Sequence, residues 1–222
     1  MNRRPIIAVD GPAAAGKGTL ARRLAATLGL PYLDTGLLYR AVGRRVLDAG
    51  GDPANAGVAE AAARALVPAD LDRGDLRGPV ADAAAAAVAA IPAVRAALLD
   101  FQRDFGRERG AVLDGRDIGT VILPDAPVKL YITASLAERA RRRWLELKAK
   151  GIEADPATVE AEMHARDTRD APNMRRADDA VELDTTALDA EAAFNRAMRH
   201  VRERLEGRAT VIWDSLEDSR HA

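Results

Sequence analysis

The stretch that most constrains the fold lies near the N-terminus, where an apolar run, a glycine-rich turn and a helix-like segment follow one another. Pro5 to Val9 is short, apolar and β-branched, which is typical of a buried strand. Gly11 comes next, and Gly16-Lys17 follows after four residues. Leucines then recur with helical spacing, at Leu20, Leu24 and Leu28. A strand, a glycine loop and a helix in this order predict a phosphate-binding loop.

Polyphosphate recognition explains the residue types of this loop. Several backbone N–H groups must approach the phosphate oxygens together, and glycine allows this approach because it has no Cβ. The helix that follows presents free N–H groups and a partial positive charge to an anion. Lys17 adds a mobile charge for the β- and γ-phosphates. We therefore expect the oxygens of a polyphosphate to bind Gly11, Pro12, Ala13, Ala14, Ala15, Gly16, Lys17, Gly18 and Thr19.

The end of the loop departs from the general pattern, in which a hydroxyl residue follows the lysine directly. Here Gly18 follows Lys17, and Thr19 comes one position later. This Gly-Lys-Gly-Thr ending resembles that of the nucleoside monophosphate kinases. Thr19 is therefore a candidate ligand for Mg²⁺, and contact of its hydroxyl with phosphate is the alternative.

Composition narrows the class of protein. The chain has 222 residues, enough for one sizeable core, and its net charge of −1 gives no bulk attraction to nucleic acid. The absence of cysteine excludes disulfides and fits a reducing compartment. Ile6 to Val9 is too short for a signal or membrane segment. We expect a monomeric cytoplasmic protein that engages neither nucleic acid nor a membrane.

Strand-like and helix-like segments alternate along the chain. The expected strands are 5–9, 31–34, 111–114, 128–132 and 181–184, with 210–213 as an edge strand or packed tail. The expected helices are 16–28, 35–49, 52–67, 80–90, 94–109, 135–150, 155–168 and 189–205. This alternation predicts an α/β fold of the P-loop NTPase type, with a parallel sheet covered by helices on both faces. The order of the strands cannot be deduced from the sequence.

We expect a single domain, 1–222, with a core of 1–67 and 91–215. By the resemblance to nucleoside monophosphate kinases, the segment of about 68–90 is expected to be a short insert for binding the nucleoside monophosphate (NMP). Its first part, Pro68 to Pro79, is polar and broken by Gly and Pro, and its second part is nearly all alanine. The segment of about 166–178 joins a charged helix end to an irregular loop, as a mobile lid over phosphates does.

The strand Ala111 to Asp114 ends in a charged turn, Asp114-Gly115-Arg116-Asp117. A carboxylate at the end of a strand beside a phosphate loop is where such sites hold Mg²⁺ through water, so Asp114 is a candidate. A salt-linked turn without a ligand is the alternative. Four arginines of the helix 135–150 are expected to form mainly a solvated face, with one or two able to reach phosphate: Arg139, Arg141, Arg142 and Arg143.

Six segments together resemble the bacterial cytidylate kinases over nearly the whole chain. They are Gly11 to Thr19, Asp34-Thr35-Gly36 with Tyr39-Arg40, Ile91 to Arg95, Asp114 to Thr120, Pro124 to Lys129, and Arg166 to Asp170. The resemblance implies an enzyme of pyrimidine nucleotide metabolism that transfers the γ-phosphoryl group of ATP to CMP or dCMP with Mg²⁺. ATP, CMP and dCMP would be its partners.

The resemblance also implies roles for individual residues. The ATP phosphates would bind the loop from Gly11 to Thr19, and the catalytic residues would be Lys17, Arg116, Arg166 and Arg169. CMP or dCMP would bind Thr35, Tyr39, Arg40, Arg95, Arg116, Asp117, Arg166 and Asp170. Within this set Arg95 and Asp117 would bind the cytosine base. Mg²⁺ would be held by Thr19 and, through water, by Asp114.

The base assignment also has a chemical rationale. Cytosine presents a 4-amino donor, which a carboxylate such as Asp117 accepts, and Arg95 could donate to N3 or O2. Uracil would place its O4 against the carboxylate and leave both acceptors unpaired.

Three features depart from the family pattern. Pro68 to Pro79 is too short for the small antiparallel sheet usual there, Ala86 stands where a serine usually contacts the base, and Asn173 stands where an arginine is usual. Arg175 or Arg176 could replace that arginine. These departures concern substrate affinity more than the reaction.

Other functions remain as alternatives. A phosphate-loop kinase for UMP, AMP or a shikimate-like alcohol would share the loop but would not need Arg95 with Asp117. A GTPase switch would need a guanine-binding Asn-Lys-x-Asp run, which the sequence lacks. A non-catalytic ATP-binding scaffold would not need Lys17 and the set of arginines.

Overall fold

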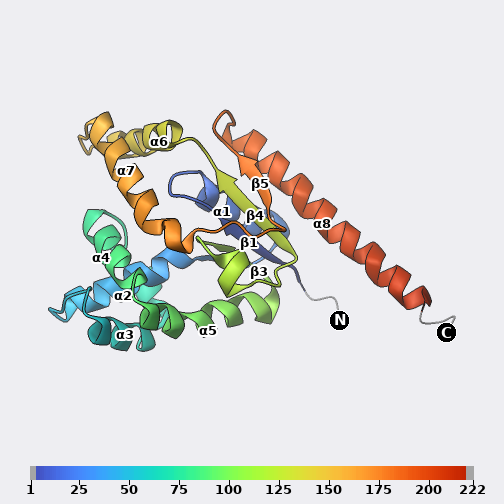
Figure 1. Ribbon diagram of the computed structural model, residues 1–222, viewed down its shortest axis with the longest axis horizontal. Helices are drawn as coiled ribbons and strands as arrows, with labels where there is room; N and C mark the ends of the chain where they lie inside the picture. Colours follow the sequence, from blue (N-terminus) through green and yellow to red (C-terminus); the bar gives the residue numbers. More distant parts are fainter. Residues whose placement is uncertain (1–3, 219–222) are drawn as a thin grey trace. The chain divides into compact units, whose positions relative to one another are not determined.

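The computed structural model describes residues 4–218 and divides the chain into two compact units (Figure 1). The first, here called the sheet unit, comprises Met1–Tyr32 and Arg109–Ala222. The second, the helical unit, comprises Leu33–Glu108. The predicted insert of about 68–90 falls inside the helical unit.

A five-stranded sheet with the order β2-β3-β1-β4-β5 forms the centre of the fold. β1 (Ile6–Asp10) pairs in parallel with β3 (Ala111–Asp114) on one side and with β4 (Val128–Thr133) on the other. β4 also pairs in parallel with β5 (Val181–Asp184), and β2 (Tyr32–Asp34) lies at the opposite edge. The predicted α/β class with a parallel sheet is confirmed.

The helices of the sheet unit follow the strands in sequence. They are α1 (Lys17–Leu28), α6 (Leu136–Ala149), α7 (Pro156–Asp170) and α8 (Ala190–Asp218), with a π-helical turn η2 (Ile118–Ile122) and a 3₁₀ turn η3 (Ala171–Asn173). α6 and α7 pack together, and α8 lies alongside β5 (Figure 1). The core joins Ile7 and Val9 of β1 to leucines of α1 and to Met198 and Val201 of α8. This burial on the central strand explains its continuous apolar sequence.

Gly11 is required where the chain leaves β1. Its φ of 140° lies in the region that side chains avoid, and a Cβ there would lie 1.9 Å from the carbonyl oxygen of Ile132. The chain can therefore turn into the phosphate loop against β4 only at a residue without a side chain.

The helical unit contains α2 (Thr35–Asp48), α3 (Ala56–Arg64), the 3₁₀ turn η1 (Pro68–Asp72), α4 (Pro79–Ala89) and most of α5 (Pro92–Arg109). α2 and α4 approach closely, since a Cβ on Gly43 would lie 2.7 Å from the Cβ of Ala84. The alanine-rich sequence of α4 therefore serves close helix packing as well as helix propensity.

Several local predictions were wrong. The expected edge strand or packed tail at 210–213 lies within helix α8, because elongating a formed helix adds a hydrogen bond per residue and overrides local β-propensity. α3 begins at Ala56, inside the expected helix 52–67, because the side chain of Asn55 accepts from the Val58 N–H and caps it. By contrast, α2 begins at Thr35 as expected, and Asp34 occupies the N-cap position.

Within the described residues, 4–218, no single helix is long and apolar enough to cross a membrane. Only the segments Pro79–Ala89 and Pro92–Glu108 meet the criteria of length and composition when taken together, and they are bent by 98° relative to each other.

Candidate active site

The loop from Gly11 to Gly16 has the backbone geometry of an anion cradle. Ala14 has a φ of 59° and Gly16 a φ of 90°, so two positive-φ residues flank Ala15 before α1 begins. Backbone that alternates in this way turns successive N–H groups toward one concavity. Gly16 is the N-cap of α1, which adds the positive end of a helix dipole to the same loop. This geometry is suited to binding phosphate.

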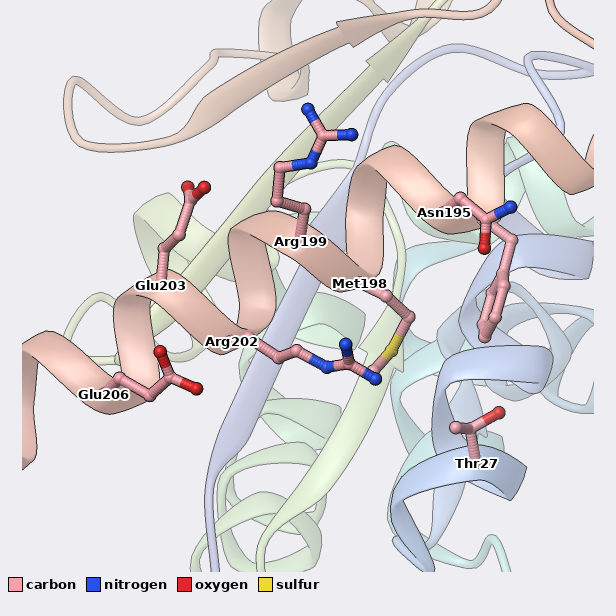
Figure 2. Close-up of a pocket in the computed structure, with 8 residues that line it drawn as sticks. Thr27, Asn195, Met198, Arg199, Arg202, Glu203 and Glu206 are labelled. Carbon is pink, nitrogen blue, oxygen red and sulfur yellow. The ribbon is translucent and has the colours of Figure 1, made fainter.

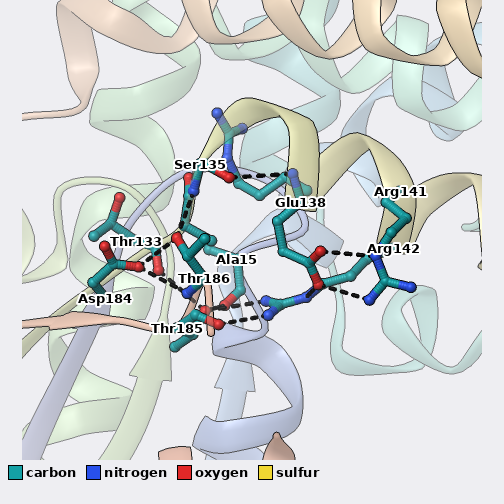
Figure 3. A network of polar contacts seen from close by, with 11 residues as sticks. Ala15, Thr133, Ser135, Glu138, Arg141, Arg142, Asp184, Thr185 and Thr186 are labelled. Carbon is teal, nitrogen blue, oxygen red and sulfur yellow. Dashed lines mark hydrogen bonds and ion pairs between the residues drawn. The ribbon is translucent and has the colours of Figure 1, made fainter. Parts of the chain in front are cut away.

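Two buried side chains hold carbonyl groups of this loop. The Thr185 hydroxyl lies 3.0 Å from the Ala15 carbonyl oxygen, in the network that Figure 3 shows. Arg139 Nη1 donates to the Ala13 carbonyl oxygen at 3.4 Å. Thr185 and Arg139 are 3% and 5% exposed, so solvent does not compete for these bonds. The sequence interpretation identified neither residue, because each is far from the loop in sequence.

Lys17 and Asp114 form a buried ion pair at the mouth of the loop. Lys17 Nζ lies 3.5 Å from Asp114 Oδ1, and Tyr32 donates its hydroxyl to Asp114 Oδ2 at 3.3 Å. Asp114 also lies against α1, because a Cβ on Gly18 would be 3.0 Å from its Oδ2. The structure thus brings together Lys17 and Asp114, which the sequence predicts as a catalytic residue and a metal ligand.

Thr19 is exposed in the first turn of α1. Among residues 4–218, no group of three or more His, Cys, Asp and Glu side chains could hold a metal ion by itself. The carboxylate of Asp114 beside the loop and the hydroxyl of Thr19 are the hard oxygen ligands that Mg²⁺ prefers, and Mg²⁺ usually keeps several waters. These residues therefore fit a metal held jointly by protein, water and substrate phosphates.

Asp10, at the end of β1, is a buried carboxylate that the sequence interpretation missed. Its two oxygens accept the N–H groups of Ile118 and Gly119, each at 2.8 Å, and so hold the start of η2. Burial raises the pKa of Asp10 to about 6, and the charges of Asp117 and Asp114 also raise it, while the two backbone hydrogen bonds lower it. The sequence feature that could have identified Asp10 is its position directly before the glycine-rich loop.

Asp117, the predicted base-binding carboxylate, is 6% exposed and occupies the N-cap position of η2. Its carbonyl oxygen accepts the N–H groups of Val121 and Ile122. The clamp that Asp10 places on η2 therefore fixes the backbone next to Asp117. A charged turn was predicted here, but the π-helical turn was not, because the anchoring carboxylate lies on a different strand.

Arg116, Arg166 and Asp170 come together in the sheet unit. Arg116 Nε donates to Asp170 Oδ2 at 2.9 Å, and Arg166 Nε lies 3.9 Å from the same oxygen. All three residues are partly buried, whereas Arg169 is exposed on α7. The structure therefore gathers three of the residues that the sequence predicts for the acceptor, with a carboxylate between two guanidinium groups.

The expectation was a mainly solvated face for four arginines of α6, with one or two able to reach phosphate, and Arg139 is not on such a face. It forms a bidentate pair with Asp167, at 3.0 and 2.6 Å, and Arg139 Nε donates to the Ala134 carbonyl oxygen at 2.9 Å. Asp167 lies on α7, in the predicted lid. Arg139 thus links the lid helix to the phosphate loop through one buried guanidinium.

The helical unit carries the other predicted acceptor residues. Arg40 Nε donates to Asp82 Oδ1 at 2.9 Å, and Thr35 is buried at the start of α2. The guanidinium of Arg95 lies 5.8 Å from the ring centroid of Tyr39. Within this unit, therefore, Arg40 is paired with a carboxylate of α4, and Arg95 lies beside an aromatic ring.

The comparisons with known proteins agree over almost the whole chain. The family model described as "Cytidylate kinase" matches residues 7–203. The cytidylate kinase of Granulibacter bethesdensis is 63% identical over 205 residues, which cover 90% of this chain and 98% of that protein.

The chain belongs to the cytidylate kinase family.

Two further cytidylate kinases extend this match. That of Acidiphilium cryptum is 61% identical over 201 residues, covering 89% of this chain and 95% of that protein. That of Methylocella silvestris is 58% identical over 222 residues, which cover 98% of this chain and 97% of that protein. The family resemblance and the kinase class inferred from the sequence are confirmed.

A solved structure supports the fold alone. The crystal structure of an uncharacterized protein from Eubacterium ventriosum matches with a TM-score of 0.53 and 15% identity, and covers 90% of this chain and 99% of that chain. Together with the family match, this supports a P-loop NTPase-type fold for this cytidylate kinase family member.

The positions that depart from the family pattern are also visible. Asn173 is partly buried and ends η3, whereas Arg175 is exposed. Arg176 Nη1 donates to Glu182 Oε2 at 2.6 Å, so this arginine is engaged with β5. Ala86 is partly buried on α4.

A cavity of about 390 Å³ lies away from all predicted site residues (Figure 2). Thr27 of α1 lines it, together with Phe194, Asn195, Met198, Arg199, Arg202, Glu203 and Glu206 of α8. Arg199 and Arg202 are exposed on α8, so this is a charged surface hollow outside the phosphate loop.

Proposed function

We propose that this member of the cytidylate kinase family transfers the γ-phosphoryl group of ATP to CMP or dCMP, giving ADP and CDP or dCDP. The observation that carries the proposal is the family match over residues 7–203. The buried Lys17–Asp114 pair at a loop of phosphate-binding geometry supports the same reaction class.

The phosphate loop binds the donor in this proposal. Its N–H groups and the N-terminus of α1 receive the phosphate oxygens, and Lys17 places its ammonium on the β- and γ-phosphates. Lys17 is paired with Asp114 in this structure, so its ammonium already lies at the loop before a nucleotide arrives. Little covalent chemistry is required of the protein, because phosphoryl transfer depends mainly on positioning and on stabilising charge.

We further propose that Asp114, through water, and Thr19 hold Mg²⁺ with the phosphates of ATP. When bound, Mg²⁺ neutralises charge that develops on the phosphate oxygens. The pairing of Lys17 with Asp114 keeps both charges at the loop, and Tyr32 orients the carboxylate through its hydroxyl.

The acceptor is assigned to the residues that the sequence predicts for it. Thr35, Tyr39 and Arg40 bind its phosphate. Asp117 accepts from the 4-amino group of cytosine, and Arg95 donates to N3 or O2. Because uracil has an acceptor where cytosine has this donor, the site would reject UMP.

Arg116, which follows β3, and three lid residues complete the charge balance. Arg116 and Arg166 bind phosphate, Asp170 contacts the acceptor, and Arg169 stabilises the transferring phosphoryl group. Arg116 and Arg166 both contact the carboxylate of Asp170 in this structure. A phosphate that binds these two arginines would therefore lie next to that carboxylate or replace it as their partner. Closure of such a lid keeps water from accepting the phosphoryl group.

A panel of acceptors tests the function. Purified protein is given ATP and Mg²⁺ with CMP, dCMP, UMP, AMP or shikimate, and ADP release is followed in a coupled assay. We expect turnover with CMP and dCMP, and at least a hundredfold lower kcat/KM with UMP, AMP and shikimate, an order of magnitude typical of hydrogen-bonded base selection. Absence of CDP, or equal use of UMP, would contradict the proposal.

We also propose that the enzyme is a monomer in the cytoplasm and that nucleotides are its partners. Its net charge of −1 supports the absence of a nucleic-acid partner. Sedimentation equilibrium tests the monomer, since a dimer would give twice the chain mass.

A further inference from the structure

Thr185 joins three segments of the sheet unit around the phosphate loop. It follows β5 and is 3% exposed. Its hydroxyl lies 3.0 Å from the Ala15 carbonyl oxygen and 3.1 Å from that of Thr133, while its own N–H donates to the Thr133 carbonyl at 2.8 Å. Figure 3 shows these bonds meeting at one side chain. The residue therefore fastens the loop to the ends of β4 and β5.

Arg142 donates to the Thr185 hydroxyl oxygen and so leaves the hydroxyl proton for a carbonyl group. Arg142 Nη1 donates to Thr185 Oγ1 at 3.0 Å, and Nη2 donates to the Thr185 carbonyl oxygen at 2.6 Å. Because the hydroxyl oxygen accepts from a cation, its single proton is directed to a carbonyl, Ala15 or Thr133. Glu138 accepts from Arg142 Nε at 2.9 Å and holds the guanidinium in place (Figure 3).

The bond to Ala15 has a consequence inside the loop. A peptide group is planar and trans, so its C=O and the following N–H point in opposite directions. Holding the Ala15 carbonyl toward Thr185 therefore turns the Gly16 N–H away from Thr185. Gly16 is the N-cap of α1, and because it has no Cβ this peptide can adopt several orientations unless it is held.

We propose that Thr185 is a positioning residue for ATP, which acts by orienting the Ala15–Gly16 peptide, and that Arg142 orients its hydroxyl. This inference rests on the proposed function, because it assumes that the loop binds the donor phosphates. It adds two residues, one in the β5–α8 connection and one on α6, to the nucleotide-binding machinery.

The neighbouring Thr186 provides a matched control. It is exposed, its hydroxyl donates to Asp184 at 2.6 Å, and it accepts the Ser135 N–H at 2.9 Å (Figure 3). It has the same side chain and adjoins Thr185, but its bonds do not involve the phosphate loop.

The experiment measures ATP binding by titration calorimetry, without an acceptor, together with KM values for ATP and CMP. Thr185→Val keeps the shape of the side chain and removes the hydroxyl, whereas Thr185→Ser keeps the hydroxyl. We expect the valine variant to bind ATP about tenfold more weakly, the loss of one buried hydrogen bond. Its KM for CMP should stay within about twofold, and the serine and Thr186→Val variants should match the parent.

The outcomes separate this inference from the proposed function. If the parent binds no ATP, the function itself fails. If the parent binds ATP and Thr185→Val binds it equally well, or if Thr185→Ser is as impaired as the valine variant, the positioning role is wrong. Should Thr185→Val fail to fold, Arg142→Lys keeps the charge but not the paired contacts. A selective increase in the KM for ATP in Arg142→Lys would support the role, and an unchanged KM would overturn it.

Discussion

The two units hold their polar groups in different ways. In the sheet unit, Asp10, Lys17, Arg139 and Thr185 are each less than 9% exposed, and three of them bond to main-chain groups. In the helical unit, partly exposed arginines pair with carboxylates on other turns and helices: Arg40 with Asp82, Arg44 with Asp48 and Asp75, Arg45 with Asp70, and Arg73 with Asp48 and Asp75.

This contrast has a physical meaning for binding. Buried bonds to the backbone fix the shape of a loop, because water cannot replace them. Ion pairs at exposed positions contribute little free energy and exchange readily. We infer that the phosphate loop already has its binding shape before ATP arrives. In the helical unit, by contrast, an acceptor phosphate can replace a carboxylate as the partner of an arginine.

The largest expected effect comes from the buried lysine of the sheet unit. Lys17→Ala should lower kcat by about a thousandfold or more, since it removes the loop cation, paired with Asp114, that is assigned to the β- and γ-phosphates. Lys129→Ala is the matched control, because it removes another buried lysine that pairs with an aspartate, here the exposed Asp179 at 2.9 Å. Steady-state kinetics and circular dichroism check both variants. If both variants lost turnover to a similar extent, the loss would come from removing a buried lysine and not from a role of Lys17 in phosphate binding.

Asp10 should make the stability of the sheet unit depend on pH. Its pKa of about 6 in the fold lies above the usual 3.8, so ionisation is harder in the folded state. Its contribution is therefore largest below about pH 4 and is lost as the pH rises to about 6, a change of about 3 kcal/mol. Urea unfolding of the parent and Asp10→Asn should show their difference shifting in favour of the variant over this interval. A constant difference would contradict the raised pKa.

Asp117 tests whether a buried carboxylate of the sheet unit also sets specificity. Asp117→Ala should reduce the preference for CMP over UMP by about a hundredfold, more than it lowers kcat at saturating CMP. The ratio of kcat/KM values for the two acceptors is the measurement. An unchanged ratio would remove Asp117 from base binding.

The smallest effect is expected in the helical unit. Asp75→Ala breaks the pairs with Arg44 and Arg73, and the melting temperature should change by no more than about 2 °C. Kinetic constants should stay within about twofold of the parent. A large loss of stability would show that these ion pairs stabilise the fold as strongly as the buried contacts of the sheet unit do, which would contradict the contrast between the two units.

The sequence predicts what is local. The strand, glycine loop and helix from Ile6 to Leu28 are contiguous, so their order is enough to identify them. Arg139, Asp10 and Thr185 could not be found in this way, because each bonds to a residue more than 100 positions away. An arginine on a charged helix has the same local pattern whether it is exposed or buried.

Strand order and the conformation of the segment 210–213 could not be predicted from the local sequence. Nothing in the run from Ile6 to Asp10 indicates that β1 lies between β3 and β4, since pairing partners are separated by long crossovers. The segment Thr210 to Trp213 has strand-like residues, yet it continues the helix that starts at Ala190.

The tether between Thr185 and Ala15 spans 170 positions of the chain. During synthesis the phosphate loop therefore leaves the ribosome well before its anchor. The central strand β1 likewise emerges well before β3 and β4, its two neighbours. Nascent chains that stop short of residue 185 should bind ATP more weakly than chains that extend past it.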